Sequence, residues 1–319
     1  MKRKVLIFSG PTATGKTALS IKSALEIEKS LNHKCCIINF DSLAFYKELL
    51  IGSARVKKED MHGIKHYLVG TESIKNPVDA HQFKELAEDI IHQNPDKILI
   101  FVGGSGFYIR ALIKGMYETT TVDSQMREEL NKLYNEKGIT PFIEFLEEND
   151  PESLEILHEN DHYRIMRAVE FFKANGQKIS ESKKQSDQDD PYDFSQNNFP
   201  DWEILHIYLD IPRPEHFEII QKRTWDMIQE GLIDEVENLI QQGFTGQERP
   251  LQSIGYKEAQ DYIEGKFKTE QDLAERISIS TRQLAKAQRT FFKKVKGKET
   301  FHPLKESDKV IEAVKKFIE

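Results

Sequence analysis

Short, uninterrupted apolar runs alternate with amphipathic stretches along most of the chain. Four of the apolar runs have the length of a buried strand, and several amphipathic stretches have the spacing of helices that cover a core. Buried strands separated by helices are typical of a parallel sheet with both faces covered. We therefore predict an α/β fold in which helices flank a parallel sheet. The predicted strands span residues 4–9, 35–40, 97–102 and 204–209, and the predicted core helices span residues 18–31, 80–93, 213–231, 232–242, 256–263 and 269–295.

The middle of the chain carries helical patterns with no strand between them. Asp161 is predicted to cap the last of these helices and Gly176 to end it. A polar stretch at residues 178–201 then predicts a linker or mobile loop. The sequence therefore predicts a core made of residues 1–117 and 202–319, interrupted by an all-helical insertion at residues 118–201. The helices predicted within the insertion span residues 125–138, 140–149, 151–158 and 161–175.

The composition is that of a globular protein, with 319 residues of which 38% are hydrophobic and 31% charged. No apolar run approaches the roughly 18 residues of a membrane span, and too few apolar residues follow the basic N-terminus for a signal peptide. Cys35 and Cys36 are adjacent and form neither a disulfide framework nor a zinc spacing. We expect a cytoplasmic protein without a membrane partner.

A glycine-rich loop joins the first predicted strand to the first predicted helix. Its spacing, G-x-x-x-x-G-K-T, is that of a phosphate loop, in which backbone N–H groups and a helix N-terminus bind phosphate oxygens. The lysine adds a charge, and the hydroxyl that follows it can bind Mg²⁺. A chance match in an ordinary strand–helix turn is the alternative, which the flanking strand and helix disfavour. The sequence thus predicts a P-loop NTPase-like core. The motif comprises Gly10, Pro11, Thr12, Ala13, Thr14, Gly15, Lys16 and Thr17.

Two further predicted strands end in residues that could bind a ligand at the same sheet edge. Asp41 and Ser42 follow the second strand, and Ser105 follows the third strand after two glycines. Asp41 is either a helix N-cap or a functional carboxylate. The third strand lacks the terminal acidic residue with which phosphate-loop ATPases and GTPases hold Mg²⁺. We therefore expect the loop to hold the diphosphate or triphosphate of a group donor.

The charge is unevenly distributed along the chain. The net charge of −8 disfavours nucleic acid as a partner, but residues 276–298 contain eight Lys or Arg and no Asp or Glu. A local basic surface can bind phosphates even when the total charge is negative. A solvated helix face is the alternative for this segment.

Seven motifs, in order, resemble those of the tRNA dimethylallyltransferases, also called tRNA isopentenyltransferases. The resemblance covers nearly the whole chain and is to the bacterial type, because the sequence has no Cys/His zinc finger. The phosphate loop is the first motif. The other six lie at residues 41–54, 66–68 with Phe83, 102–108, 160–170, 253–256 and 281–286.

The resemblance implies transfer of a dimethylallyl group from dimethylallyl diphosphate to N6 of the tRNA adenosine on the 3′ side of the anticodon. The phosphate loop, with Lys16, would bind the donor diphosphate, and Mg²⁺ would lie near Thr17. Asp41 would take the proton of the adenine amine, and Ser105 would position the base or the donor. Arg223 would neutralise the leaving diphosphate. An exposed charge on an amphipathic helix is the alternative for Arg223.

The resemblance also implies contacts with the tRNA anticodon stem-loop. Arg164 and Arg167 are three residues apart and share one helix face. A salt bridge to a neighbour such as Glu170 is the alternative for one of the two. We expect a monomer. The implied tRNA-binding residues are Asp41, Ser42, Leu43, Ala44, Ser105, Arg127, Tyr163, Arg164, Ile165, Met166, Arg167, Arg282 and Lys286.

The chain departs from the family pattern at several positions, which could shift its substrate preference. Ala44 stands where Gln is frequent, Ser105 where Thr is usual, and Ile219 where many members have Arg. An arginine is lost at Ala287, and another is gained at Arg289.

Three other functions remain open. Prenyl transfer to free adenylate would need neither the helical insertion nor the basic C-terminal helix. A small-molecule kinase that uses ATP would leave the other six motifs without a purpose. A non-catalytic RNA-binding protein would not need Lys16 or Asp41.

Overall fold

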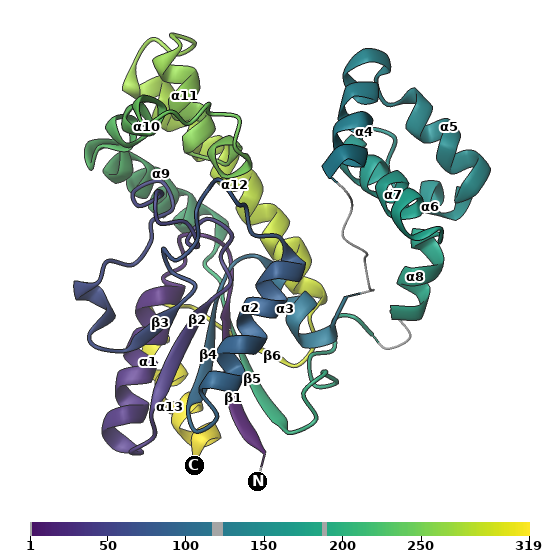
Figure 1. Cartoon of the computed structure of the whole chain (residues 1–319). Helices are drawn as coiled ribbons and strands as arrows, with labels where there is room; N and C mark the ends of the chain where they lie inside the picture. The colour runs from purple at the N-terminus through teal and green to yellow at the C-terminus, as the bar shows by residue number, and fades with distance from the viewer. Residues whose placement is uncertain (1, 117–123, 187–189) are drawn as a thin grey trace. The chain divides into compact units, whose positions relative to one another are not determined.

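A six-stranded, wholly parallel sheet lies at the centre of the larger part of the protein (Figure 1). The computed structural model describes residues 2–116, 124–186 and 190–319. The order of the strands is β3-β2-β4-β1-β5-β6, and the predicted α/β class is confirmed. The strands are β1 (Arg3–Ser9), β2 (Cys35–Asn39), β3 (Lys65–Tyr67), β4 (Ile98–Gly103), β5 (Trp202–Leu209) and β6 (Lys298–Phe301).

The register of the central strands brings three strand ends together. β1 lies between β4 and β5, and Ser9 at its end pairs with Gly103 and Tyr208. Asn39, at the end of β2, pairs with Val102 of β4. The loops that follow β1, β2 and β4 therefore leave the sheet at one edge, where open α/β folds bind ligands.

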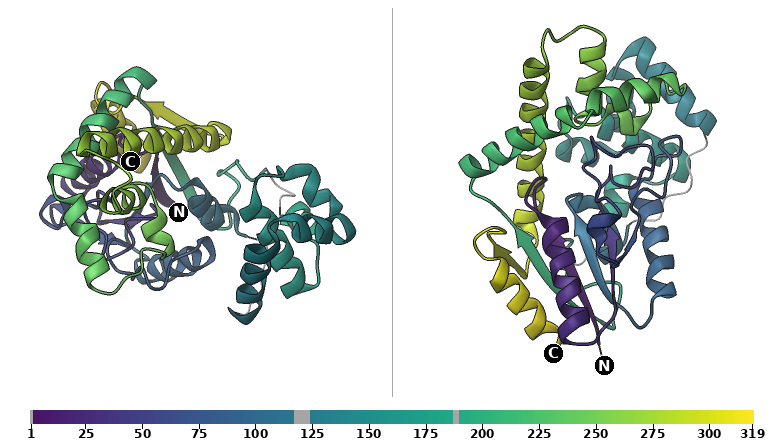
Figure 2. Two further views of the ribbon diagram at one scale, coloured as in Figure 1. Left: turned by 90° about the horizontal axis from the view of Figure 1, so that it is seen from above. Right: turned by 90° about the vertical axis from the view of Figure 1, so that its left-hand side faces the viewer.

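Helices cover both faces of the sheet. α1 and α13 pack on one face through a continuous apolar cluster that includes Leu6, Ile100 and Val314. On the other face, Phe292 of α12 packs against His206 and Tyr208 of β5. α9 lies along α12, and the two chain ends lie near each other at the opposite end of the sheet from the phosphate loop (Figures 1 and 2). The core helices are α1 (Lys16–Ser30), α2 (Ala80–Gln93), α3 (Gly106–Lys114), α9 (Arg213–Gln229), α10 (Leu232–Gln241), α11 (Tyr256–Ile263), α12 (Glu270–Lys294) and α13 (Ser307–Ile318), with short 3₁₀ turns at Glu59–Met61 and Arg249–Gln252.

The insertion has a hydrophobic core of its own. Phe142, Leu146 and Ile165 are buried together there. The Asp161 carboxylate accepts a hydrogen bond from the Arg164 N–H and caps α7, as predicted, and Gly176 ends this helix in a left-handed conformation. The helices of the insertion are α4 (Ser124–Lys137), α5 (Thr140–Asn149), α6 (Pro151–Ile156), α7 (His162–Asn175) and α8 (Ile179–Ser186).

The end of the insertion lies earlier than predicted. The chain divides into residues 1–114 with 192–319 and residues 115–191, whereas residue 201 was the predicted end. The prediction of a linker or mobile loop at residues 178–201 is wrong for residues 179–186, which form α8; the described residues 190–201 form a loop, and this loop packs on the core. Phe199 stacks on Trp202 with ring centroids 3.9 Å apart, and Tyr192 contacts Phe291 edge to face. These aromatic side chains fix an otherwise polar segment. The predicted break at residue 117 lies outside the described residues.

None of the helices in the described part of the chain combines the length and the apolar character that a membrane span requires.

Candidate active site

The phosphate loop between β1 and α1 has the backbone conformation that its glycines predict. Gly15 has a φ of 72°, in the left-handed region, and precedes the first turn of α1. Gly10 has a φ of 149°, and a side chain there would collide with the Leu209 carbonyl oxygen. The carbonyl oxygen of Pro11 accepts hydrogen bonds from Thr14 Oγ1 at 2.9 Å and from Lys16 Nζ at 2.7 Å.

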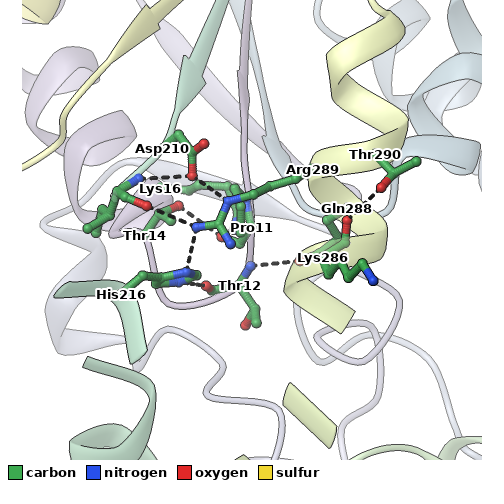
Figure 3. A network of polar contacts seen from close by, with 11 residues as sticks. Pro11, Thr12, Thr14, Lys16, Asp210, His216, Lys286, Gln288, Arg289 and Thr290 are labelled. Atoms are coloured by element: carbon green, nitrogen blue, oxygen red, sulfur yellow. Dashed lines mark hydrogen bonds and ion pairs between the residues drawn. The ribbon is translucent and has the colours of Figure 1, made fainter. Parts of the chain in front are cut away.

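Thr12, in the middle of this loop, is held by side chains from two helices (Figure 3). Its N–H donates to Gln288 Oε1 of α12 at 2.8 Å, and its carbonyl oxygen is 2.8 Å from His216 Nε2 of α9. Its hydroxyl oxygen accepts a hydrogen bond from Arg223 Nη1 at 3.1 Å. The structure therefore anchors the front of the loop to elements far away in the sequence.

Asp41 lies in a turn directly after β2. No helix follows it, so the N-cap alternative is wrong. Its carboxylate accepts a hydrogen bond from the Leu43 N–H at 3.2 Å, and its own N–H donates to Asn39 Oδ1. The Ser42 N–H donates to Ser105 Oγ at 3.2 Å, which joins the ends of β2 and β4. The two strand-end motifs therefore form one wall.

One cavity of about 690 Å³ joins this wall to the phosphate loop. Residues that the sequence predicted separately, from four segments, meet on its lining. The size is within the range of pockets for small ligands. The predicted lining residues are Thr12, Ala13, Gly15, Lys16, Thr17, Asp41, Ser42, Leu43, Ala44, Ser105 and Arg223; of the loop's other residues, Gly10, Pro11 and Thr14 form its framework.

The charges on the lining are concentrated and partly removed from water. Lys16 is 9% exposed, and burial lowers its pKa to about 8, although the negative charge of Asp41 acts in the opposite direction. Burial also lowers the pKa of Arg223, again against the effect of Asp41. Arg223 lines the cavity and contacts the loop, so the alternative of an exposed surface charge is wrong for this residue. Two cations facing one carboxylate make a site suited to an anion.

The other predicted tRNA contacts lie outside this cavity. Arg282 stacks on Phe217 of α9, and Lys286 is exposed on α12. In the insertion, Tyr163 is 61% exposed. Ile165 is completely buried in the core of the insertion, so its side chain is not available for the predicted contact with tRNA. A periodic apolar position on an amphipathic helix is a core position first. Met166 packs against the same core.

Two of the predicted arginines are paired with one buried carboxylate. Arg167 binds Glu170, which is 4% exposed, and Arg127 lies 3.9 Å from the same residue. Arg164 forms an ion pair with Asp161, with Nη1 3.3 Å from Oδ2, but its side chain is 70% exposed. The salt-bridge alternative therefore describes Arg167, while Arg164 keeps a charge that faces solvent.

Several lining residues were not predicted as functional. The loop at residues 52–56, the turn at residues 253–255 and Gln288 all border the cavity. The first two belong to motifs noticed in the sequence, but nothing in either motif indicated its orientation. Ile219, where many family members have arginine, is also on the lining.

The cavity can accommodate a diphosphate-bound Mg²⁺ with few protein ligands. Thr17, which carries a hydroxyl, is on the cavity lining and is the one protein ligand expected for the ion. Among the described residues there is no cluster of three or more His, Cys, Asp or Glu that could hold a metal ion without the substrate. This donor set fits Mg²⁺, which typically binds one or two protein oxygens together with substrate phosphates and water.

Known proteins resemble the chain over almost its entire length. The family model described as IPP transferase matches residues 44–295. A tRNA dimethylallyltransferase from Petrotoga mobilis is 37% identical over 297 residues, covering 92% of each chain. Another from Clostridioides difficile is 34% identical over 303 residues, covering 94% of this chain and 92% of the relative.

Solved structures also resemble the chain. A tRNA delta(2)-isopentenylpyrophosphate transferase from Staphylococcus epidermidis superposes with a TM-score of 0.67 at 30% identity, covering 99% of both chains. A eukaryotic dimethylallyltransferase acting on tRNA has the same fold, with a TM-score of 0.77 at 23% identity over 99% of this chain and 79% of the other. The chain therefore belongs to the IPP transferase family, together with these tRNA dimethylallyltransferases.

Proposed function

We propose that this protein transfers the dimethylallyl group of dimethylallyl diphosphate to N6 of the tRNA adenosine on the 3′ side of the anticodon and releases diphosphate. One observation carries the proposal: the phosphate loop and the Asp41 carboxylate line the same cavity. The names of the relatives support the choice of donor and acceptor. β4 ends at Gly103 and has no acidic residue at its end. A nucleotide hydrolase would need such a residue there, so this argues against hydrolysis.

The residues on the lining can be given roles that balance the reaction. The N6 lone pair attacks C1 of the allyl group, the C1–O bond to diphosphate breaks, and the N6 proton passes to Asp41. The loop N–H groups, Lys16 and Arg223 stabilise the charge that develops on the leaving diphosphate. Ser105, beside Ser42, orients the adenine. Holding both reactants together in one cavity also favours attack by N6 over capture of the allyl cation by water.

Mg²⁺ bound to the donor would be held by the Thr17 hydroxyl and by the phosphates themselves. When bound, it neutralises charge on the departing diphosphate.

The acceptor is proposed to be tRNA rather than free adenylate. Lys286 of α12 and Tyr163 and Arg164 of the insertion are exposed, and Arg282 of α12 is half-buried over Phe217. Cations and aromatic rings of this kind bind RNA backbones and unstacked bases. A small acceptor would fit the cavity without them. The target base must leave its stack to enter, and single-stranded loops permit this at the lowest cost.

Transfer assays test the proposal directly. Purified protein, Mg²⁺ and dimethylallyl diphosphate are incubated with unmodified tRNA, with AMP or with no acceptor, and the nucleosides are analysed by mass spectrometry. We expect N6-dimethylallyl adenosine from the tRNA sample only. Product from AMP alone would favour the adenylate alternative. Turnover of ATP with no prenyl product would favour the kinase.

The substitution Asp41→Asn tests whether the Asp41 carboxylate is the base. The amide keeps an oxygen for the Leu43 N–H but cannot take a proton at neutral pH, so transfer should fall by about 100-fold or more while tRNA binding is retained. Asp96→Asn, an exposed aspartate just before β4, is the matched control and should retain full activity. Undiminished transfer by Asp41→Asn would remove Asp41 from the mechanism.

A further inference from the structure

Arg289 of α12 is a residue whose role the reaction does not explain. Its Nε donates to Asp210 Oδ1 at 2.8 Å, and its Nη2 donates to the Ile211 carbonyl oxygen at 3.0 Å. The same Nη2 is 2.7 Å from Nδ1 of His216 (Figure 3). The Arg289 side chain is only 15% exposed. An arginine with three partners and so little exposure is not a surface charge available to RNA.

These contacts fix the tautomer of His216. A guanidinium can only donate, so Nδ1 of the imidazole must be the acceptor. In neutral histidine the proton then resides on Nε2. Nε2 lies 2.8 Å from the Thr12 carbonyl oxygen and donates to it. Arg289 thereby sets which atom of His216 carries the hydrogen that reaches the phosphate loop.

The Thr12 peptide groups determine how the front of the loop is oriented. With its carbonyl oxygen held by His216 and its N–H held by Gln288, Thr12 cannot rotate without breaking hydrogen bonds to both α9 and α12. Thr12 is followed by Ala13, which has a φ of 62°, a conformation that a non-glycine residue adopts only when its surroundings hold it. The relay from Arg289 supplies part of that support.

We propose that Arg289 and His216 are positioning residues for the diphosphate: the relay Arg289–His216–Thr12 holds the phosphate loop in its anion-binding conformation. The identity of the anion as the donor's diphosphate rests on the proposed function. Preorganised loops bind with less loss of conformational freedom, so loosening Thr12 should weaken diphosphate binding without removing any group that contacts it.

Binding of inorganic diphosphate with Mg²⁺, followed by calorimetry on the full-length protein, tests the relay. We expect Arg289→Met to raise the dissociation constant about tenfold, the effect of losing one or two hydrogen bonds on loop order. His216→Phe should have a similar effect. Because both act through the same carbonyl oxygen, the double variant should be little weaker than either single one. Arg289→Lys, which keeps the charge but loses the fork, should be intermediate.

The controls separate positioning from mere stability. Arg276→Met removes an exposed arginine from the same helix, about three and a half turns before Arg289, and should leave diphosphate affinity unchanged. In transfer assays the Arg289 variants should raise the KM for the donor more than they lower kcat. If the folded Arg289→Met or Arg289→Lys protein has a lower melting temperature but binds diphosphate as the wild type does, the relay is overturned. If the wild type itself binds no diphosphate, the proposed function fails first.

Discussion

Lys16, Arg223 and Asp41 show how the site is charged at the level of single residues. Burial lowers the pKa of both cations, so keeping them charged costs free energy in the folded protein. Among the described residues, neither cation has a carboxylate within salt-bridge distance. Lys16 donates to the Pro11 carbonyl oxygen and Arg223 to the Thr12 hydroxyl oxygen, both of which are uncharged. Groups held at such a cost are typical of functional sites. A diphosphate would supply the missing negative charge.

The pH dependence of diphosphate binding should reveal Lys16. With a pKa of about 8 in the protein, Lys16 is partly neutral at pH 8.5, whereas a bound diphosphate favours its protonated form. Binding should therefore take up protons at pH 8.5, take up few at pH 6.5, and weaken as the pH rises above about 8. Calorimetry in buffers with different ionisation enthalpies measures the uptake. Lys16→Met should bind diphosphate more weakly and should lose the proton uptake; uptake that persists in this variant would assign it to another group.

The side chains that carry the chemistry of the site could be predicted from sequence, but the residues that hold the phosphate loop in place could not. Lys16 and Asp41 stand in motifs whose spacing follows from strand, loop and helix geometry. His216 and Gln288 act on backbone groups of Thr12, and a backbone partner leaves no pattern in the residue types. Arg289 was visible only as a departure from a family pattern, with no sign of the element it would contact.

At the scale of elements, α7 carries two arginines with different surroundings. Arg164 is 70% exposed, whereas Arg167 binds the buried Glu170. Arg164→Ala should therefore weaken tRNA binding and lower the slope of log affinity against log salt by about one unit, as loss of one phosphate contact does. Arg167→Ala should instead destabilise the insertion by about 2 kcal/mol, because a buried carboxylate loses a partner.

Filter binding at several salt concentrations, together with thermal unfolding of both variants, measures the two effects separately. An unchanged salt slope for Arg164→Ala would show that its charge does not meet RNA.

The contact between α6 and α8 depends on Asp150. This carboxylate is 1% exposed and accepts hydrogen bonds from Ser153 Oγ at 2.6 Å and from Ser180 Oγ at 2.5 Å. Burial alone would raise the pKa of Asp150, but these hydrogen bonds outweigh it and lower the pKa below the ordinary value of 3.8. Its stabilising effect should thus be complete above about pH 4 and be lost as the pH falls through the lower folded-state pKa.

Asp150→Ala should destabilise the insertion by about 2 to 3 kcal/mol at neutral pH. Hydrogen exchange should become faster in α6 and α8 and stay unchanged in the sheet. Asp161→Ala, which removes an ordinary N-cap, should cost only about 1 kcal/mol. Equal effects of the two substitutions would mean that the α6–α8 link contributes no more than a cap.

Elements with strong periodic patterns were predicted well, and those defined by tertiary contacts were missed. Residues 80–93 and 140–149 were predicted as helices with their observed bounds. β3, α3, β6 and α13 were missed. β6 is a half-exposed edge strand of only four residues with no apolar run. α13 is an exception to this rule, because its apolar residues Val310, Val314 and Ile318 do have helical spacing. An edge strand next to β5 acquires its conformation from pairing, which a local pattern does not encode.

At the scale of the whole molecule, the insertion interrupts the sequence of the core, but the core segments just before and just after it stay in contact. The Asn198 N–H donates to the Ile113 carbonyl oxygen at 2.9 Å, and Lys114 Nζ donates to the Gln196 carbonyl oxygen at 2.6 Å. The chain therefore leaves the core and returns to it at neighbouring points. Because the core also contains the entire cavity lining and its own apolar cluster, the donor site needs no residue of the insertion.

Replacing residues 115–191 with a Gly-Ser linker of about six residues, which reaches on the order of 13 Å, should therefore give a folded core. Inorganic diphosphate should bind within about twofold of the full chain, since distant and independent sites contribute additively. Binding of tRNA should weaken by about tenfold or more, because Arg164 and the other exposed groups of the insertion are gone. Calorimetry and filter binding measure the two affinities on one preparation. Normal tRNA binding by the shortened chain would confine acceptor recognition to α12 and the cavity, and loss of diphosphate binding would show that the core depends on the insertion.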